Sequence, residues 1–496
     1  MLQIETERDI ERLRQVALLQ EAEIQRLLAR LAELTRQLAE ARGEDAVQAL
    51  QLELTLINEQ LAARNRALFG ASSEKRPRGD GEEASKAKPP QSGHGRREQR
   101  DLPLVEVVHL LDEADKTCPK CGGNLDAWAG QFEAADEIDV IERSFCIVRH
   151  QRQKYRCGCG ECIDTALGPQ KLIPGGRYSV DFAVEVAAAK YLDHMPLARQ
   201  TRQMGREGLV VDTQTLWDQL FALYGHLVPS YDAILRLVLG APVIGADETR
   251  WRLMDAKGST KWWAWSVCSP EAVAYRIFPT RSTDAGAELL AGYQGIVVCD
   301  GYAAYGSIRE CLARDGPTFT IANCWAHARR GFVEAESAYP KAKEMIELIA
   351  KLYEVEVRAR DGQLDLGELR RSKSAATVAQ IKRWLETTVA TPSSSLGKAI
   401  LYMLDLWTDL ERFLTDPRIP IDNNATERGI RGLALGRKNH YGSRSERGTK
   451  VAALFYTLIE SAKLTRVNPK QYLREAARRA IANPGTVTLP RELLPA

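Results

Sequence analysis

The chain has 496 residues, of which 27% are charged and 44% hydrophobic, an ordinary balance for a water-soluble protein of roughly three domains. The net charge is only +2, and no run of about 18 apolar residues predicts a membrane span. Its charged amino terminus, MLQIETERDIERLRQ, is unlike a secretory signal. Six of the ten cysteines lie between residues 118 and 162, five of them in two short motifs, which indicates metal binding in a reducing cytoplasm.

The amino-terminal region, residues 1–69, carries a heptad pattern. Leu13, Leu27 and Leu34 occupy one core position, and polar Gln20 stands in the same series. The partner position recurs every seven residues at Ile10, Ala17, Ile24, Leu31 and Leu38. This pattern predicts coiled-coil helices that join chains into a homo-oligomer, with a dimer as the expected form. An amphipathic helix that folds back on its own domain is the alternative.

Residues 70–103 have almost no large apolar side chain, so we expect a disordered linker. Residues 104–173 follow as a predicted zinc-binding module. The motif CPKCGG supplies two thiolates, and CGCGEC supplies three more where two are needed for tetrahedral Zn²⁺. Four of five cysteines would therefore bind a structural zinc ion, and the sequence leaves open which of the last three is not a ligand: Cys118, Cys121, Cys157, Cys159 and Cys162.

Residues 174–240 have a helical pattern throughout. We expect one helix from Leu197 to Arg206, a turn at EGLVV, and a second helix that starts near Thr213 with Asp212 as its cap. Two helices joined by a short turn fit a helix-turn-helix, so this region is a predicted DNA-binding element. Acidic and basic residues balance there, and an ordinary helical hairpin is the alternative.

Residues 241–436 alternate between strands and helices. Residues 241–255 are a predicted strand with Asp247 near its end, two further β-rich runs follow, and a helix begins at Ser282 or Thr283. A buried strand ends at Asp300, and a fifth strand precedes the helix in NCWAHARRGFVEA. Three antiparallel strands, a helix and then more strands with helices are the order of a ribonuclease-H-like fold. That order places the two aspartates at the ends of adjacent central strands.

A third carboxylate stands in IDNNATERGIR, residues 421–431. Taken alone, this stretch predicts a capped surface helix in which Glu427 pairs with Arg431 one turn later. Beside Asp247 and Asp300, however, Glu427 would complete a site for two Mg²⁺ or Mn²⁺ ions about 4 Å apart. Asp422 competes for the same role, but we expect it to serve as a helix cap together with Asn423 and Asn424.

Basic residues surround and follow this helix. From Arg428 to Ala480 the chain has thirteen lysines and arginines against three glutamates, so residues 437–496 are a predicted basic helical domain facing nucleic acid. A solvated basic helical face is the alternative. The residues expected to contact DNA phosphates are Arg428, Arg431, Arg437 and Lys438.

Other chemically suggestive residues receive plainer interpretations. Asp284 is expected at the surface. Cys324 and His327 have a C-x2-H spacing, but such a pair by itself rarely forms a metal site, and the approach of His327 to the catalytic centre is left open. The tryptophans of KWWAWSVCS are interpreted as strand packing rather than as base-stacking residues.

Several motifs together give a family resemblance over nearly the full length. The sequences LFGASSEK, CPKCGG, ADETRWRL, VCDGYAAY, NCWAHARR and IDNNATERGIRGLALGRKN resemble the large transposase of the insertion sequence 66 family. The resemblance implies a DDE triad at Asp247, Asp300 and Glu427, and a ribonuclease-H-like core interrupted by an all-helical insertion at about 341–415. The extra cysteine of CGCGEC departs from the simple pair that the family leads us to expect.

We therefore expect a multidomain α+β protein that binds the ends of a mobile element and transfers them to target DNA. The resemblance implies a bacterial cytoplasmic protein, nucleoid-associated when bound to DNA, that works without a membrane and with small accessory proteins of the same element. A nuclease or resolvase that does not join strands is one alternative. A catalytically decayed DNA-binding regulator is the other.

Overall fold

The structure is a computed structural model that describes residues 26, 29, 33, 36, 55–59, 106, 108–112, 116, 119–127, 144–156, 163–255 and 258–494. The chain divides into two compact units, Gly70–Arg143 and the remainder. Most of the expected heptad residues, the linker 70–103 and four of the expected zinc ligands lie outside the described residues. The coiled coil and the disordered linker therefore stay predictions.

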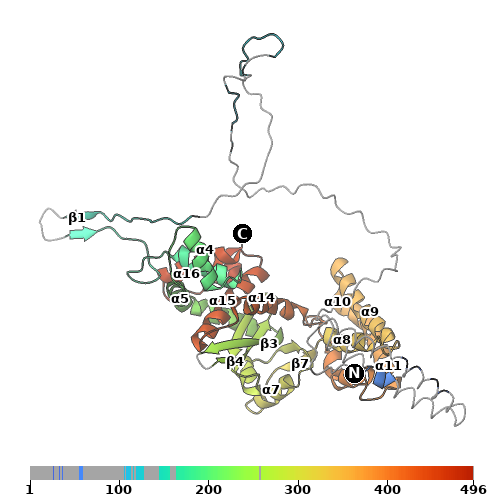
Figure 1. Cartoon of the computed structure of the whole chain (residues 1–496). Coiled ribbons are helices and arrows are strands. Elements are labelled where there is room, and N and C mark those ends of the chain that lie inside the picture. Colours follow the sequence, from blue (N-terminus) through green and yellow to red (C-terminus); the bar gives the residue numbers. More distant parts are fainter. Residues whose placement is uncertain are drawn as a thin grey trace, which may run out of the picture. The chain divides into compact units, whose positions relative to one another are not determined.

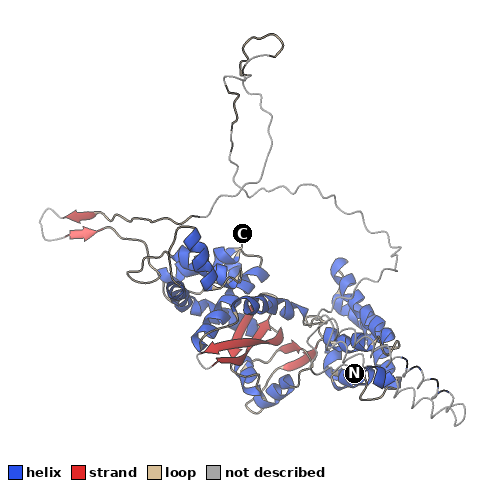
Figure 2. Ribbon diagram, in the orientation of Figure 1, coloured by secondary structure: helices blue, strands red, loops and turns tan. Residues whose placement is uncertain are grey.

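A five-stranded mixed sheet lies in the larger unit (Figure 2). Its strand order is β5-β4-β3-β6-β7, with β3, β4 and β5 antiparallel to one another and β6 and β7 parallel to β3. This is the strand sequence that the β-rich runs predicted. The bounds are β3 Val243–Asp255, β4 Gly258–Cys268, β5 Val273–Phe278, β6 Ile296–Cys299 and β7 Thr320–Asn323, with helices α6 Thr283–Leu290 and α7 Ala304–Leu312 as connections.

The long strand β3 corrects the expectation that Asp247 lies near the end of its strand. Only Val243–Gly245 pair with β6, whereas the hairpin with β4 continues to the pair of Asp255 and Gly258. Asp247 therefore lies in the middle of β3, but just beyond the part of it that has a parallel neighbour. The predicted strand over residues 241–255 and its antiparallel neighbours are present, and only the position of Asp247 within the strand differs.

Helices that precede the strands in the sequence and helices that follow them share one hydrophobic core with the sheet. The structure confirms the expected bounds of α4 and the start of α5, where the Asp212 side chain accepts a hydrogen bond from Thr215 N at 2.6 Å. The helices of this core region are α3 Val180–Tyr191, α4 Leu197–Arg206, α5 Thr213–Leu239, α15 Glu446–Leu464 and α16 Pro469–Ala482. The core thus joins segments that the sequence assigned to separate regions.

Helix α15 covers the edge strand β5. Ser461 Oγ accepts a hydrogen bond from Val273 N at 3.1 Å and donates to Val273 O at 2.8 Å, and Thr457 Oγ1 accepts from Tyr275 N at 3.0 Å. Hydroxyl groups of a helix therefore take the place of the missing neighbouring strand. An edge that is satisfied in this way offers no template for pairing with another chain.

The segment between β7 and α14 is helical, as the expected insertion at 341–415 requires, and lies beyond β7 in Figure 1. It has its own hydrophobic core, to which Val243, Val298 and Ala322 of the sheet also belong. Its elements are α8 Trp325–Ala335, α9 Ala342–Asp361, α10 Leu366–Leu369, η2 Arg370–Ser374, α11 Ala375–Thr387, α12 Ser395–Asp405, α13 Trp407–Leu410 and η3 Glu411–Leu414. The chain then returns to the sheet through α14, Asn424–His440.

A two-stranded hairpin carries the second cysteine group. Strand β1, Lys154–Arg156, pairs with β2, Ile163–Thr165, and residues 157–162 connect them. The expected strand directly before Cys157 is therefore present. Within the described part of the chain, no helix is both long and apolar enough to cross a membrane.

Candidate functional site

Two aspartates stand side by side on neighbouring parallel strands. Gly245 of β3 pairs with Val298 of β6, so the same register two residues further on brings Asp247 beside Asp300, which directly follows β6. The turn after β6 holds Asp300 in place, because Tyr302 N donates a hydrogen bond to its Oδ1 at 3.1 Å. The expectation that the two acids lie on adjacent strands agrees with this register.

Helix α14 brings Glu427 to the same end of the sheet. Its first turn packs against β3, where Asn423 Nδ2 donates a hydrogen bond to Ala246 O at 2.8 Å. Gly245 faces this turn, and a Cβ atom there would overlap with Thr426 Oγ1 and Asn423 Oδ1. The absence of a side chain at Gly245 therefore permits the close approach that places Glu427 near the aspartates.

The capping expectation for this helix is wrong in detail. Asn423 is the N-cap residue, but its side chain makes no capping hydrogen bond and binds β3 instead. Asp422 accepts hydrogen bonds from Asn424 N at 3.1 Å and from Asn424 Nδ2 at 2.6 Å. Asp422, an expected helix cap, therefore orders the turn before α14 instead, while Asn423 attaches the helix to the sheet.

His327 lies much closer to the acids than its C-x2-H spacing indicated. Its Nε2 is 3.6 Å from Glu427 Oε1, in place of the expected pair between Glu427 and Arg431. Two contacts hold the first turn of α8 to the segment before α14: Trp325 N donates to Ile421 O at 3.1 Å, and Asn423 N donates to Cys324 Sγ at 3.2 Å. These tertiary contacts, which no local pattern encodes, bring the histidine to Glu427.

The three acids form a concentration of negative charge. Burial, as the largest cause, and the charges of Glu248, Asp300 and Glu427 together raise the pKa of Asp247 to about 7, against one hydrogen bond from Glu248 N that lowers it. A bound cation would relieve this repulsion and displace the proton. Within the described residues, no three acidic, histidine or cysteine side chains close around a single point as one metal cage.

The donor set nevertheless fits hard divalent cations. Mg²⁺ prefers oxygen ligands and keeps several waters, so it needs only one or two carboxylates together with phosphate oxygens. Asp247, Asp300 and Glu427 supply carboxylate oxygens and no softer ligand. The residues that would hold Mg²⁺ or Mn²⁺ are therefore present, on two strands and a helix.

The basic residues of α14 divide into two groups. Arg428, Arg431 and Lys438 are exposed, on the helix that begins beside the acids. Arg437 is half-buried and binds β3 through Arg250 O and through Thr249 Oγ1, the latter at 3.2 Å. Arg437 thus fastens α14 to the sheet, and the three exposed residues remain the better placed to reach a phosphate backbone.

The sequence interpretation missed Glu248, which follows Asp247 and is almost fully buried. It pairs with Arg281, and Tyr305 Oη donates a hydrogen bond to it at 2.8 Å. Strand alternation could have revealed it, because Glu248 shares the face of Ile244 and Ala246. An acid among apolar residues on a core-facing side needs a buried partner.

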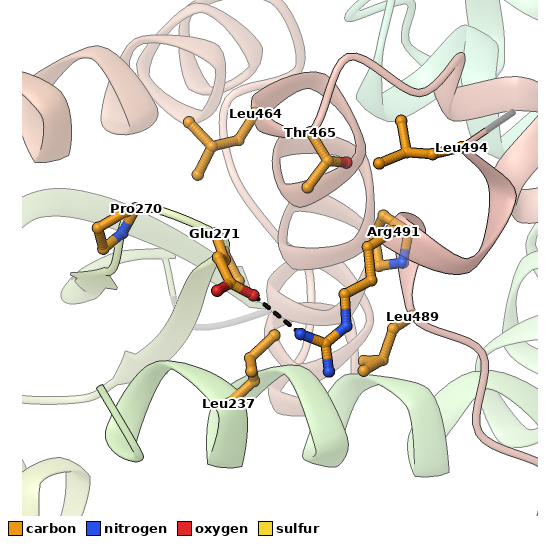
Figure 3. A pocket seen from close by; sticks show the side chains of 10 residues that line it. Leu237, Pro270, Glu271, Leu464, Thr465, Leu489, Arg491 and Leu494 are labelled. Carbon is orange, nitrogen blue, oxygen red and sulfur yellow. Dashed lines mark hydrogen bonds and ion pairs between the residues drawn. The ribbon is translucent and has the colours of Figure 1, made fainter. Parts of the chain in front are cut away.

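A cavity of about 280 Å³ lies elsewhere in the larger unit and is lined by none of these acids. Its lining is mainly apolar and includes Leu237, Leu464 and Leu494, and its rim carries an ion pair between Glu271 and Arg491 at 3.0 Å (Figure 3). Two opposite charges that neutralise each other leave no free group for chemistry. The cavity therefore does not compete with the carboxylates as the candidate site.

Comparison with known proteins gives two family matches and several similar proteins. The profile described as "Transposase IS66 family" matches residues 175–451, and the profile "zinc-finger binding domain of transposase IS66" matches residues 115–160. Two relatives from Sinorhizobium fredii (strain NBRC 101917 / NGR234) bear the names "Uncharacterized protein y4jD" and "Uncharacterized protein y4qI". The first is 30% identical over 418 residues, covering 80% of this chain and 80% of the relative. The second is 32% identical over 422 residues, covering 81% of this chain and 76% of the relative.

The first profile covers more than half of the chain and includes Asp247, Asp300 and Glu427. The second covers the CPKCGG motif and reaches into CGCGEC. The chain belongs to the IS66 transposase family.

Proposed function

We propose that this transposase cuts DNA at the ends of its element and joins those ends to target DNA with Asp247, Asp300 and Glu427 as its catalytic acids. One observation carries the proposal: the register of β3 and β6 brings Asp247 beside Asp300, and the first turn of α14, attached to β3 through Asn423, brings Glu427 to the same end of the sheet. The fold therefore gathers three carboxylates although Glu427 lies far along the chain.

Each residue has a role that follows from its place. Asp247 and Asp300 are carried by paired strands and give the site a rigid base, while Glu427 closes it from α14. The chemistry supplied by bound Mg²⁺ or Mn²⁺ is activation of the attacking water or 3′-hydroxyl and stabilisation of the leaving oxygen. Arg428 and Arg431, exposed on the same helix, contact the phosphates that flank the reacting one.

The domain arrangement supports the same proposal. We infer a ribonuclease-H-like core within residues 241–436, interrupted by the helical insertion, because the strand order β5-β4-β3-β6-β7 with two parallel strands after an antiparallel meander matches that expectation. Residues 174–240 and 437–496 are proposed to bind DNA beside it. Residues 1–69 are proposed to join two copies, and residues 70–103 to link them to the zinc module.

A structural zinc ion is supported by the zinc-finger match at residues 115–160. We propose that Cys118 and Cys121 bind it together with two of Cys157, Cys159 and Cys162. The module would contribute to recognition of the element's ends in the bacterial cytoplasm, on nucleoid DNA, with small accessory proteins of the same element. Metal removal would then abolish end recognition and leave the catalytic acids in place.

The test uses purified full-length protein, labelled DNA with the element's own ends, and an unlabelled target duplex. Asp247→Asn, Asp300→Asn and Glu427→Gln should each abolish cleavage and joining with Mg²⁺ or Mn²⁺, while binding to the DNA ends persists. Asp284→Asn, an exposed acid of α6, is the matched control and should retain activity. Activity that survives in Glu427→Gln and is lost in Asp422→Asn would show that the third acid is Asp422.

The same assay separates the alternative functions. Cleavage by the wild-type protein without joined products would identify a nuclease or resolvase. End binding without any cleavage, under both metals, would identify a DNA-binding regulator whose catalytic centre has decayed.

A further inference from the structure

The two aspartates are connected to each other by a series of contacts behind the candidate site. Glu248 N donates a hydrogen bond to Asp247 Oδ1 at 2.8 Å, and Tyr302 N donates to Asp300 Oδ1 at 3.1 Å. Arg281 lies between these two anchors: its guanidinium binds Glu248 and stands 3.5 Å from the centre of the Tyr302 ring. One arginine side chain therefore contacts both residues whose backbone N–H groups bind the two aspartates.

The carboxylate of Glu248 is well satisfied by this arrangement. It accepts hydrogen bonds from Arg281 Nε at 2.7 Å, from Arg281 Nη2, and from Tyr305 Oη at 2.8 Å. Its side chain is only 1% exposed. The ring of Trp263 lies on another side of the guanidinium, 4.9 Å from it. We call Glu248, Arg281, Tyr302 and Tyr305 the arginine clamp.

The clamp matters because Glu248 is a fourth acid beside the three proposed ligands. Its charge is the largest electrostatic contribution to the raised pKa of Asp247. An unpaired carboxylate at this buried position would have to take up a proton or turn toward the cation. Arg281 binds this carboxylate on the face of β3 opposite to Asp247, so that the carboxylate is occupied there.

We propose that Arg281 is a positioning residue that sets the relative placement of Asp247 and Asp300 for divalent metal binding. The inference rests on the proposed function, since it takes the two aspartates as ligands. Outer contacts of this kind orient ligands, and their loss typically weakens metal affinity by about 10- to 100-fold. The geometry is specific to arginine, because Nε and Nη2 both donate to Glu248 Oε1 while the planar group stacks on a ring, whereas lysine offers a point charge without a planar fork.

Charge and positioning predict opposite results, which makes the inference testable. If Arg281 acted only through its positive charge, its removal would reduce repulsion and tighten the binding of a cation. If it positions the aspartates, its removal must weaken that binding. Arg281→Lys separates the two effects, because it keeps the charge and removes the fork and the ring contact.

The experiment measures Mn²⁺ binding to zinc-loaded full-length protein by the electron paramagnetic resonance signal of free Mn²⁺, without DNA and without turnover. Arg281→Gln and Arg281→Lys should both raise the Kd by about 10- to 100-fold. Arg276→Gln is the matched control: it breaks a solvent-exposed ion pair with Glu288, 3.1 Å long, on neighbouring β5, and should leave the Kd unchanged. Tyr302→Leu removes one ring only, and should weaken binding in the same direction if an Arg281 variant does not fold.

An unchanged or lower Kd in the Arg281 variants, or in Tyr302→Leu where it replaces them, would overturn the inference, even if their melting temperatures fell. That result would reduce the clamp to a structural contact and leave the proposed function standing. Failure of the wild-type protein to bind Mn²⁺, with no difference in Asp247→Asn, would overturn both the clamp and the catalytic assignment.

Discussion

Individual side chains in the candidate site act mostly by restricting one another. Asp300 is held by Tyr302 N, Glu248 is held by Arg281, and Glu427 stands beside His327. His327 is mostly buried, and its Nδ1 has no hydrogen-bond partner within the described residues. A mostly buried ring beside a proposed ligand limits the positions that the ligand can adopt.

His327→Ala should therefore slow DNA cleavage and joining by about 10- to 100-fold, the usual effect of losing a side chain that orients a metal ligand. DNA-end binding should not change, because the ring is nearly buried. Single-turnover cleavage of pre-bound DNA ends measures the effect. His327→Gln, which keeps a polar side chain there, should recover part of the rate, and wild-type rates in His327→Ala would refute the role.

A second histidine, His440, is buried where only its neutral form fits. Its Nδ1 lies 3.3 Å from Gly442 O, which can only accept, so Nε2 accepts from Tyr456 Oη at 3.2 Å. Burial, as the largest cause, and the nearby charges of Lys190 and His194 together lower its pKa to about 3. The rings of Tyr191 and Trp251 pack against it.

The sign of the resulting pH effect follows from the lowered pKa. Neutral His440 stabilises the fold fully above the unfolded pKa of about 6.5, and this contribution is lost as pH falls toward about 3. Between pH 7 and pH 5 the wild-type protein should lose more free energy of unfolding than His440→Gln, which does not titrate. Urea denaturation at both pH values measures this, and equal losses would contradict the buried neutral ring.

Among the elements, the crossing of α14 over β3 decides where Glu427 lies. The crossing is close because Gly245 has no side chain, and because Asn423 and Arg437 both bind the backbone of β3. A helix fixed at its first turn and again near its last turn cannot rotate Glu427 away from the aspartates. The contact between α14 and β3 thus determines where Glu427 lies relative to the two aspartates.

Gly245→Ala should separate α14 from β3, because the new Cβ overlaps with Thr426 and Asn423. Overpacking of this kind typically costs about 1–3 kcal/mol of stability, and cleavage should fall more than DNA-end binding. Gly225→Ala in α5 is the control, since nothing lies within 4 Å of a Cβ there and alanine favours a helix. Urea denaturation and cleavage assays on both variants would show whether the two substitutions differ as expected.

For the whole larger unit, the main fact is that the helices before and after the strands share a core with the sheet. Helix α15 is buried along almost its entire length and also satisfies the edge of β5. Helices α3, α5 and α16 pack against it or against one another. The proposed catalytic domain therefore depends on residues outside its sequence bounds.

A fragment of residues 241–436 should consequently fail to fold alone, because it lacks α15 and leaves β5 as an open edge. Residues 174–494 should give a monodisperse protein with a cooperative thermal transition. Circular dichroism melting and size-exclusion chromatography compare the two fragments. A soluble 241–436 fragment with a cooperative transition would show that the sheet and its insertion form an independent domain.

The sequence by itself determined the features that depend on local patterns. Capping and periodicity predicted α4 and the start of α5, and the β-rich runs predicted the succession of strands and helices along the chain. The ribonuclease-H-like order of these elements then assigned Asp247 and Asp300 to adjacent strands. Motif resemblance also selected Glu427. The predicted helices and strands agree with the structure because each relies on neighbours in the chain, whereas the role of Glu427 stays a prediction.

Only the tertiary structure decided how distant segments meet. The place of His327 beside Glu427, the attachment of Asn423 to β3 and the pairing of Arg281 with Glu248 all join residues that lie far apart in sequence. Such contacts depend on how helices pack on the sheet, and packing has no periodic signal in the chain. For the same reason, the sequence pattern assigned to separate regions several segments that share one hydrophobic core.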